Sequence, residues 1–208
     1  FMTPSLKVVV AITSPIAFHQ LKSQTILHTC LQSADSFVAS ISGAHLAIAG
    51  TAADLAKVAE IACEKIVCDP NKPGELATAI KSATTADLIM IHDSQRPLTQ
   101  PGQFERVYVA LTSDIDAVRP ASPFTETLKS INADNFIEQT IDRTSMMRIS
   151  TPELIRYSAI DFSSGISTWF VPLTHSARTA VVDADADSAR INSVKEIDLM
   201  GYLLDRNK

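Results

Sequence analysis

Glycine, cysteine and positive charge are all scarce in this sequence. Only six of its 208 residues are glycine, and 18 Lys and Arg stand against 23 Asp and Glu. Without a Gly/Ser-rich stretch, nothing marks a flexible linker between two halves of the chain. The net charge of −5 argues against nonspecific nucleic-acid binding, because counterion release needs clustered Lys and Arg. A small molecule is the partner that this composition favours.

The three cysteines, Cys30, Cys63 and Cys68, include no CxxC pair. Neither a disulfide framework nor a zinc site is therefore indicated, and a reducing cytoplasm is the expected location. The apolar run at residues 6–12 is far too short to cross a bilayer or to serve as a full secretory signal, so we expect no membrane association. Phe1 stands before Met2 and is excluded, and residues 2–208 are predicted to form a single domain.

Apolar runs and amphipathic segments alternate along the chain. Continuous apolar runs predict strands at residues 6–12, 45–50, 65–68, 87–93, 116–120 and 181–183. Apolar residues at helical spacing predict helices at residues 24–33, 53–63, 74–83 and 194–204. Strands that alternate with helices in this way form βαβ units. The predicted fold class is α/β, with a mostly parallel twisted sheet flanked by helices.

A polar run, HDSQRP at residues 92–97, ends the strand predicted at residues 87–93. In open α/β sheets, ligands bind beyond the carboxyl ends of the strands. We therefore expect the functional site here, with His92 as the only histidine placed at it. Arg96 and Pro97 are interpreted as structural, the arginine pairing locally and the proline turning the chain.

Residues 92–97 resemble the HDAARP signature of the methylerythritol phosphate cytidylyltransferases, and further matches follow in the family's order. PFTETLK at 123–129 resembles PVxDTxK, TIDR at 140–143 resembles TVDR, TPE at 151–153 resembles TPQ, and residues 190–197 resemble the C-terminal KvTxPeDl. The resemblance implies a Rossmann-like nucleotidyltransferase fold with a protruding dimerisation arm at approximately residues 130–150, and a homodimer. It also implies transfer of CMP from CTP to methylerythritol phosphate, or to a related sugar or polyol phosphate, in isoprenoid precursor synthesis.

The resemblance implies nucleotide-side roles for four residues. Asp93 would hold a Mg²⁺ ion, because a carboxylate suits a hard cation, and Asp93 and Ser94 would bind the nucleotide. Arg190, where the family has a lysine, and Lys22, as a substitute for a lost loop lysine, would neutralise phosphate charge in catalysis. The plain alternatives are a loop hydrogen bond for Asp93 and a solvated surface position for Lys22.

On the acceptor side, the resemblance implies that Thr140, Arg143 and Glu126 bind the substrate. The planar guanidinium of Arg143 would grip two phosphate oxygens, and Thr140 would add a hydroxyl. Glu126 stands where the family has Asp, so its carboxylate is displaced by one methylene. The alternative for Arg143 is a surface ion pair with Glu138 or Asp142.

The first loop departs from the family pattern. The family's AAGxGxRM lets backbone N–H groups approach a triphosphate, whereas residues 13–22 contain no glycine and include Pro15, which has no N–H. The cytosine-side Gly-Gly segment is likewise reduced to residues 71–75. Triphosphate binding is therefore predicted to be weakened or lost. Two alternatives stay open: a catalytically impaired homologue that acts as a binding or regulatory module, and a nucleotide-sugar or molybdopterin-type nucleotidyltransferase. Trp169 and Phe170 are expected in the core.

Overall fold

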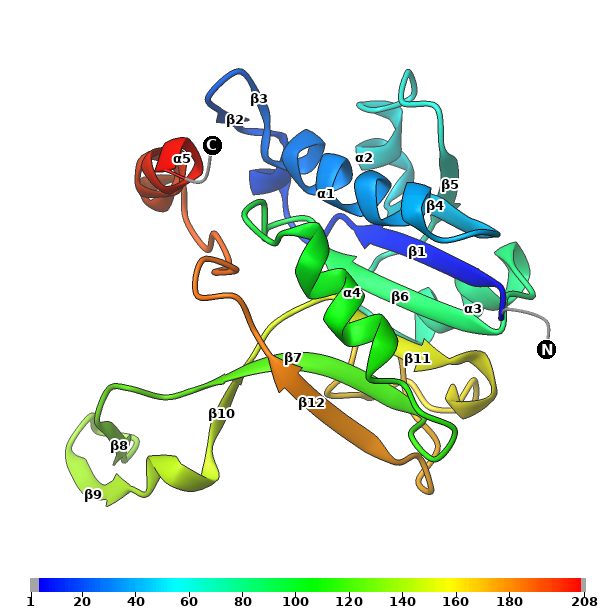
Figure 1. Ribbon diagram of the computed structural model, residues 1–208. Helices are drawn as coiled ribbons and strands as arrows, with labels where there is room; N and C mark the ends of the chain where they lie inside the picture. Colours follow the sequence, from blue (N-terminus) through cyan, green and yellow to red (C-terminus); the bar gives the residue numbers. More distant parts are fainter. Residues whose placement is uncertain (1–3, 207–208) are drawn as a thin grey trace.

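An eight-stranded sheet forms the centre of the protein (Figure 1). The computed structural model describes residues 4–206, so both ends of the expected domain 2–208, and Phe1, lie outside the described residues. Four strands run parallel in the order β6 (Leu88–Asp93), β1 (Leu6–Ala11), β4 (Ala44–Gly50) and β5 (Glu64–Val67). Beyond β6 lies β11 (Glu153–Arg156), antiparallel to both β6 and β7 (Ala117–Pro123). Strand β10 (Met147–Ile149) pairs antiparallel with β7, and β12 (Thr179–Asp183) pairs parallel with it.

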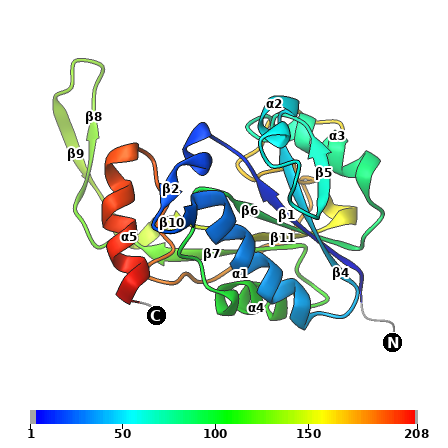
Figure 2. The same cartoon turned by 90° about the horizontal axis from the view of Figure 1, so that it is seen from above.

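Strand β1 is buried on both faces, as its unbroken apolar run predicts. Val8 and Val10 face one core cluster, while Val9 and Ala11 face the other. Each such valine stabilises the fold by roughly 1.5–3 kcal/mol relative to an exposed position. Helices α1 (Ile26–Ser40) and α4 (Pro101–Val109) cover the first face, and α3 (Pro73–Ala83) covers the second (Figure 2).

A third, smaller core joins the C-terminal part of the chain to its beginning. Helix α5 (Ile197–Arg206) packs against the short hairpin of β2 (Gln20–Leu21) and β3 (Gln24–Thr25). Its buried members are Leu21, Ile26, Leu98, Ile191 and Met200. Because Ile191 is fixed in this core, the residues beside it are held near the carboxyl end of β6.

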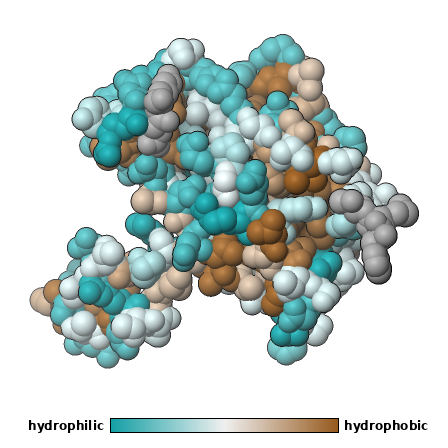
Figure 3. All heavy atoms as spheres, viewed as in Figure 1, coloured by the Kyte–Doolittle hydropathy of each residue, from teal (hydrophilic) through white to brown (hydrophobic). Residues whose placement is uncertain are grey.

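A hairpin of β8 (Leu128–Ile131) and β9 (Ile137–Ile141) projects from the body as an arm (Figures 1 and 2). The 3₁₀ turn η2 (Arg143–Ser145) follows it, and β10 then returns to the sheet. Figure 3 shows apolar side chains among polar ones on the surface of this arm, at lower left. The most exposed are Phe136 and Ile137, at 69% and 67%.

Several predicted elements have different bounds in the structure. The helix predicted at 24–33 runs from Ile26 to Ser40, whereas the one at 53–63 is only α2 (Ala52–Ala56) followed by turns. The segment 194–204 forms a 3₁₀ turn, η4 (Val194–Glu196), before α5, while another 3₁₀ turn, η3 (Tyr157–Ala159), follows β11. Helix α4 and strand β11 were not predicted. Within residues 4–206, no helix has the length and apolar character needed to span a membrane.

Candidate functional site

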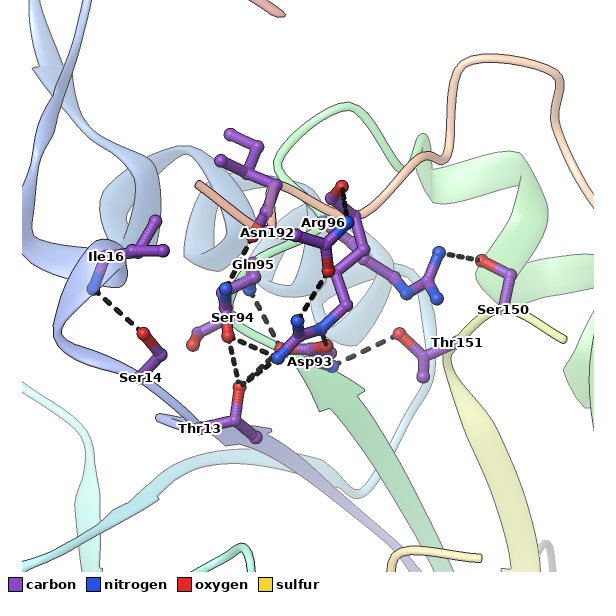
Figure 4. A network of polar contacts seen from close by, with 12 residues as sticks. Thr13, Ser14, Ile16, Asp93, Ser94, Gln95, Arg96, Ser150, Thr151 and Asn192 are labelled. Carbon is purple, nitrogen blue, oxygen red and sulfur yellow. Dashed lines mark hydrogen bonds and ion pairs between the residues drawn. The ribbon is translucent and has the colours of Figure 1, made fainter. Parts of the chain in front are cut away.

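The candidate site lies where two neighbouring parallel strands end (Figure 4). Ala11, the last residue of β1, is in register with Asp93, the last residue of β6. Thr13 follows β1 and its side chain points toward Asp93. This is the strand-end position at which the sequence predicts a site.

The Asp93 carboxylate accepts hydrogen bonds at both oxygens. Arg190 Nε donates to Oδ2 over 2.7 Å, and the backbone N–H of Gln95 donates to Oδ1 over 3.0 Å. Thr13 Oγ1 lies 2.8 Å from both Asp93 Oδ1 and Gln95 Oε1. Since a hydroxyl carries one proton, Thr13 donates to one of these oxygens at a time. The Asp93 side chain is only 7% exposed, so these partners replace most of its hydration.

Arg190 is the second centre of the site, and it is held on three sides. Its Nη2 donates to Gln95 Oε1 over 2.5 Å, and its Nη1 donates to Asn192 Oδ1 over 2.8 Å. Gln95 is itself tied to the neighbouring residue, because its Nε2 donates to the carbonyl of Ile191. The structure thus brings together Asp93 and Arg190, two residues that the sequence singled out for one site.

A buried relay fixes the backbone of Asp93 from behind. The Asp93 N–H donates to Thr151 Oγ1 over 3.1 Å, and Thr151 Oγ1 lies 2.9 Å from His92 Nδ1. Burial lowers the pKa of His92 to about 4, so its ring is neutral near pH 7. Whether His92 Nδ1 donates to or accepts from Thr151 Oγ1 depends on the tautomer of the ring. His92 packs against Phe104, away from the site. The expectation that His92 lies at the cleft is therefore wrong, because its side chain points to the opposite side of the strand from Asp93.

Two residues predicted on the nucleotide side lie elsewhere. Lys22 occupies the turn between β2 and β3 with φ of 59°, and its Nζ pairs with Asp205 of α5 at 3.0 Å. Ser94 is buried, and among the described residues its Oγ has no hydrogen-bond partner. Neither residue lines the cavities at the strand ends. Their roles stay predictions that placement does not support.

The three residues predicted on the acceptor side lie in or beside the arm. Arg143 Nη1 donates to the carbonyl of Thr125, and Thr140 Oγ1 accepts from Lys129 Nζ over 2.6 Å. Glu126 is exposed. Among the described contacts within one chain, none of the three reaches Asp93 or Arg190. Their roles stay predictions that require another copy of the chain.

Backbone N–H groups of the first loop donate hydrogen bonds to acceptors within the loop. Residues 15–18 form a 3₁₀ turn, η1 (Pro15–Phe18), capped by Ser14, whose Oγ accepts from the N–H of Ile16. Ala17 N–H donates to the carbonyl of Ser14, and His19 N–H donates to that of Ile16. Since Pro15 has no N–H, few donors of this loop are left for a phosphate. Weakened or lost triphosphate binding stays a prediction, and the small number of remaining N–H donors supports it.

Two cavities lie on either side of Arg190. The first, of about 310 Å³, is lined by Thr13, Asn71, Asp93, Glu153 and Trp169 together with Arg190. The second, of about 330 Å³, is lined by Arg96, Arg148, Ser150 and Asn192 in addition to Arg190. Arg190 is thus common to the lining of both cavities.

The two cavities differ in charge. In the first, Asp93 pairs with Arg190 and Glu153 pairs with Arg119. Burial raises the pKa of Glu153 to about 7 against the opposing effect of Arg119. The second cavity has three arginines, and the only acid in its lining, Asp185, is paired with Arg106 outside it. The second cavity is therefore the more positively charged of the two.

Arg96 shapes the second cavity through long-range hydrogen bonds. Its Nη1 donates to Ser150 Oγ over 3.1 Å and to the Ser188 carbonyl over 2.7 Å, and its Nη2 donates to the Ile149 carbonyl over 3.2 Å. The interpretation of Arg96 as structural agrees with these contacts. The expectation of local pairing is wrong, because the partners are 53 to 92 residues away in the chain.

The side chains around Asp93 do not fit a resident Mg²⁺ ion as they lie. Within residues 4–206, no group of three or more His, Cys, Asp or Glu could hold a metal ion. Asp93 Oδ2 is occupied by Arg190 and Oδ1 by the N–H of Gln95. A divalent cation on this carboxylate would meet the positive charge of Arg190 at close range. Magnesium at Asp93 stays a prediction, and it requires Arg190 to leave first.

Comparison with known proteins links this geometry to one family. The sequence pattern described as IspD, 2-C-methyl-D-erythritol 4-phosphate cytidylyltransferase, matches residues 10–165. A 2-C-methyl-D-erythritol 4-phosphate cytidylyltransferase of Rhodococcus jostii is 34% identical over 93 residues, which cover 41% of this chain and 40% of that protein. A bifunctional enzyme IspD/IspF of Brucella abortus is 28% identical over 126 residues, covering 53% of this chain and 31% of that enzyme. The chain thus spans less than half the length of these curated relatives.

Solved structures share the whole fold. A 4-diphosphocytidyl-2C-methyl-D-erythritol synthase from Anaerococcus prevotii superposes with a TM-score of 0.79 at 16% identity, covering 98% of this chain and 99% of the other. The 2-C-methyl-D-erythritol 4-phosphate cytidylyltransferase from Thermus thermophilus gives a TM-score of 0.72 at 17% identity, covering 95% and 98%. At this identity the likeness concerns the fold, and it confirms the predicted α/β nucleotidyltransferase architecture.

Proposed function

The chain belongs to the 2-C-methyl-D-erythritol 4-phosphate cytidylyltransferase family, and on that premise we propose that it transfers a cytidylyl group from CTP to methylerythritol phosphate or a related polyol phosphate. In this reaction an oxygen of the acceptor phosphate attacks the α-phosphorus of CTP, and the bond to pyrophosphate breaks. The protein's task is to position two anions and to neutralise charge. The observation that carries the proposal is the placement of Arg190 between two cavities at the end of β6.

We assign the nucleotide to the first cavity and the acceptor phosphate to the second. Thr13, Asn71 and Asp93 offer polar groups along the first cavity. Arg96 and Arg148 offer positive charge in the second, where a planar guanidinium can donate two hydrogen bonds to one phosphate. Arg190 would then lie near the bridging phosphorus, where negative charge is greatest during transfer.

A homodimer is part of this proposal. The arm carries exposed apolar side chains at Ile131, Phe136 and Ile137, with Met146 and Met147 after it. Such a patch is costly in water and is typical of an interface. In a two-fold dimer the same surface meets its own copy, so Arg143 of one subunit can serve the second cavity of the other.

The free thiols of Cys30, Cys63 and Cys68 support a reducing compartment such as the cytoplasm.

The test is a pyrophosphate-release assay with the purified chain, CTP and methylerythritol phosphate, with ATP and GTP as competing nucleotides. We expect release with CTP, and loss of at least tenfold in kcat/KM for Arg190→Ala, since about 1.4 kcal/mol of transition-state stabilisation corresponds to that factor. Folded protein that releases no pyrophosphate with any nucleotide, with or without Mg²⁺, would refute transfer.

A second candidate is a binding or regulatory module without catalysis. This candidate is favoured by the first loop, whose N–H groups bond within the loop and so are not free to bind a triphosphate. A thermal-shift titration separates the two candidates. A ligand at one hundred times its dissociation constant adds about 2.7 kcal/mol to stability, so a clear rise in melting temperature with CTP favours the enzyme.

A further inference from the structure

One wall of the first cavity, residues 168–170, is held by a buried ion pair. Arg119 on β7 pairs with Glu153 on β11, and the two side chains are 10% and 5% exposed. Arg119 Nη2 also donates to the Thr168 carbonyl over 3.1 Å, and its guanidinium lies 3.6 Å from the centre of the Trp169 ring. The N–H of Phe170 donates to Glu153 Oε2 over 2.8 Å. Two charged side chains thus fix three consecutive residues.

This wall needs a carboxylate at position 153. Donors point at both oxygens of Glu153, the guanidinium at Oε1 and the Phe170 N–H at Oε2. A glutamine, which stands at this place in the family motif TPQ, has one acceptor and one donor, so it can satisfy only one of them. An arginine in the core without a full carboxylate partner is costly. Arg119 and Glu153 therefore act as a pair that holds residues 168–170.

Another part of the cavity lining comes from the segment before α3. Asn71 Nδ2 donates to the Thr13 carbonyl over 3.1 Å, which ties this segment to the end of β1. At the start of α3, Gly74 approaches the loop 164–165 so closely that a Cβ would lie 3.1 Å from Gly165 Cα. Arg190 and residues 168–170 line the same cavity. A nucleotide whose phosphates meet Arg190 would then have its nucleoside part within this cavity, where Trp169 and Phe170 offer aromatic surface.

We propose that Arg119 and Glu153 are positioning residues that hold residues 168–170 as the wall against which the nucleoside part of the nucleotide rests. The proposal depends on the proposed nucleotide site. It assigns the pair to nucleotide affinity, because the described side-chain hydrogen bonds and ion pairs of Arg119 and Glu153 join them to each other and to residues 168–170, and not to Arg190.

Trp169 provides a direct test, since it is the only tryptophan in the chain. Its fluorescence reports on the wall without any ligand. At pH 8, Glu153→Gln should make Trp169 more accessible to acrylamide, with the quenching constant rising about twofold or more as Phe170 or Arg119 loses its acceptor. Glu105→Gln, which removes an exposed carboxylate on α4, is the matched control and should leave the quenching constant unchanged.

The second measurement is nucleotide binding and turnover. Glu153→Gln should raise the dissociation constant and the KM for CTP about fivefold to tenfold, the size of one lost hydrogen bond. The kcat at saturating CTP should change by less than about twofold, because the lost contact stabilises bound CTP equally in the ground state and in the transition state. Unchanged Trp169 quenching together with unchanged CTP affinity in folded Glu153→Gln would overturn the proposal, and so would a loss confined to kcat.

The two proposals fail in different ways. If wild-type protein does not bind CTP, the proposed function fails, and the Trp169 quenching comparison alone decides whether the pair holds the wall. If Glu153→Gln does not fold, Arg119→Lys replaces it. Lysine keeps the charge beside Glu153 but cannot stack flat on Trp169 or donate in two directions. We expect it to show raised quenching, and wild-type quenching in folded Arg119→Lys would overturn the proposal.

Discussion

Replacing Arg190 with alanine should expose the competition between an arginine and a metal ion for Asp93. The substitution removes the 2.7 Å contact to Asp93 Oδ2 and the contacts to Gln95 and Asn192. Breaking a fully buried ion pair costs about 3–5 kcal/mol. Because the Arg190 side chain is 34% exposed, water screens part of the ion-pair energy, and we expect the free energy of unfolding to fall by about 2 kcal/mol. For a chain of this size, that corresponds to a fall in melting temperature of about 4–8 °C.

Magnesium should then stabilise the variant and leave the wild type unchanged. In wild-type protein without nucleotide, Arg190 already compensates the Asp93 charge, so an added Mg²⁺ ion gains little attraction and is repelled by the guanidinium. In Arg190→Ala, Mg²⁺ at ten times its dissociation constant would add about 1.4 kcal/mol to the free energy of unfolding. Thermal melting with MgCl₂ and with EDTA measures this difference. The double variant Asp93→Asn, Arg190→Ala should lose this response. Equal stabilisation of wild type and Arg190→Ala by Mg²⁺ would refute the reasoning.

Three further predictions concern other parts of the site. Burial raises the pKa of Glu153 from its ordinary 4.5 to about 7. Between these pH values the folded protein binds more protons than the unfolded chain. The free energy of unfolding should therefore fall as pH rises, by no more than about 3 kcal/mol. Urea unfolding at pH 5 and pH 8 should show this slope, and Glu153→Gln should flatten it, whereas equal slopes would contradict the assignment. Arg148→Ala should raise the KM for the acceptor phosphate about tenfold and leave that for CTP unchanged, since one charge-assisted hydrogen bond is worth about 1.5–3 kcal/mol; an effect on both substrates would argue against separate cavities. Gly74→Ala should lower stability by about 1 kcal/mol, because its Cβ would lie 3.1 Å from Gly165 Cα; Gly102→Ala, with nothing nearer than 3.8 Å, should not, and equal melting temperatures would refute the steric argument.

The strands of the parallel core could be predicted because their burial on two faces leaves an unbroken apolar run. The runs at 6–12 and 87–93 correspond to β1 and β6 within one residue at each end. Strand β11 has only four residues and lies between β6 and β7 as an antiparallel insertion. So short a segment carries no periodicity that distinguishes it from a loop. Helix α4 begins at Pro101 and Gly102, which read as breakers, although proline at the first helical position is favourable.

The pairing of Asp93 with Arg190 could be foreseen only as two matches to separate motifs. Thr13 carried a weaker signal, since it directly follows a predicted strand. The role of Glu153 was hidden, because its ion partner lies on another strand and its cavity partners lie in an irregular loop. Trp169 and Phe170 were predicted in the core. They pack beside the second core cluster but also line the first cavity, because the ion pair holds them at its edge.

The hydrogen bond between Thr13 and Arg190 spans 177 residues of sequence. A ribosome has therefore translated nearly the whole described chain before the second half of the site exists. Until then Asp93 lacks its counter-ion, and Gln95 lacks its hydrogen bonds to Ile191. Contacts so distant along the chain form late and slow the search for the native state. The site is thus complete only after Arg190 and Asn192 have been translated and have left the ribosome.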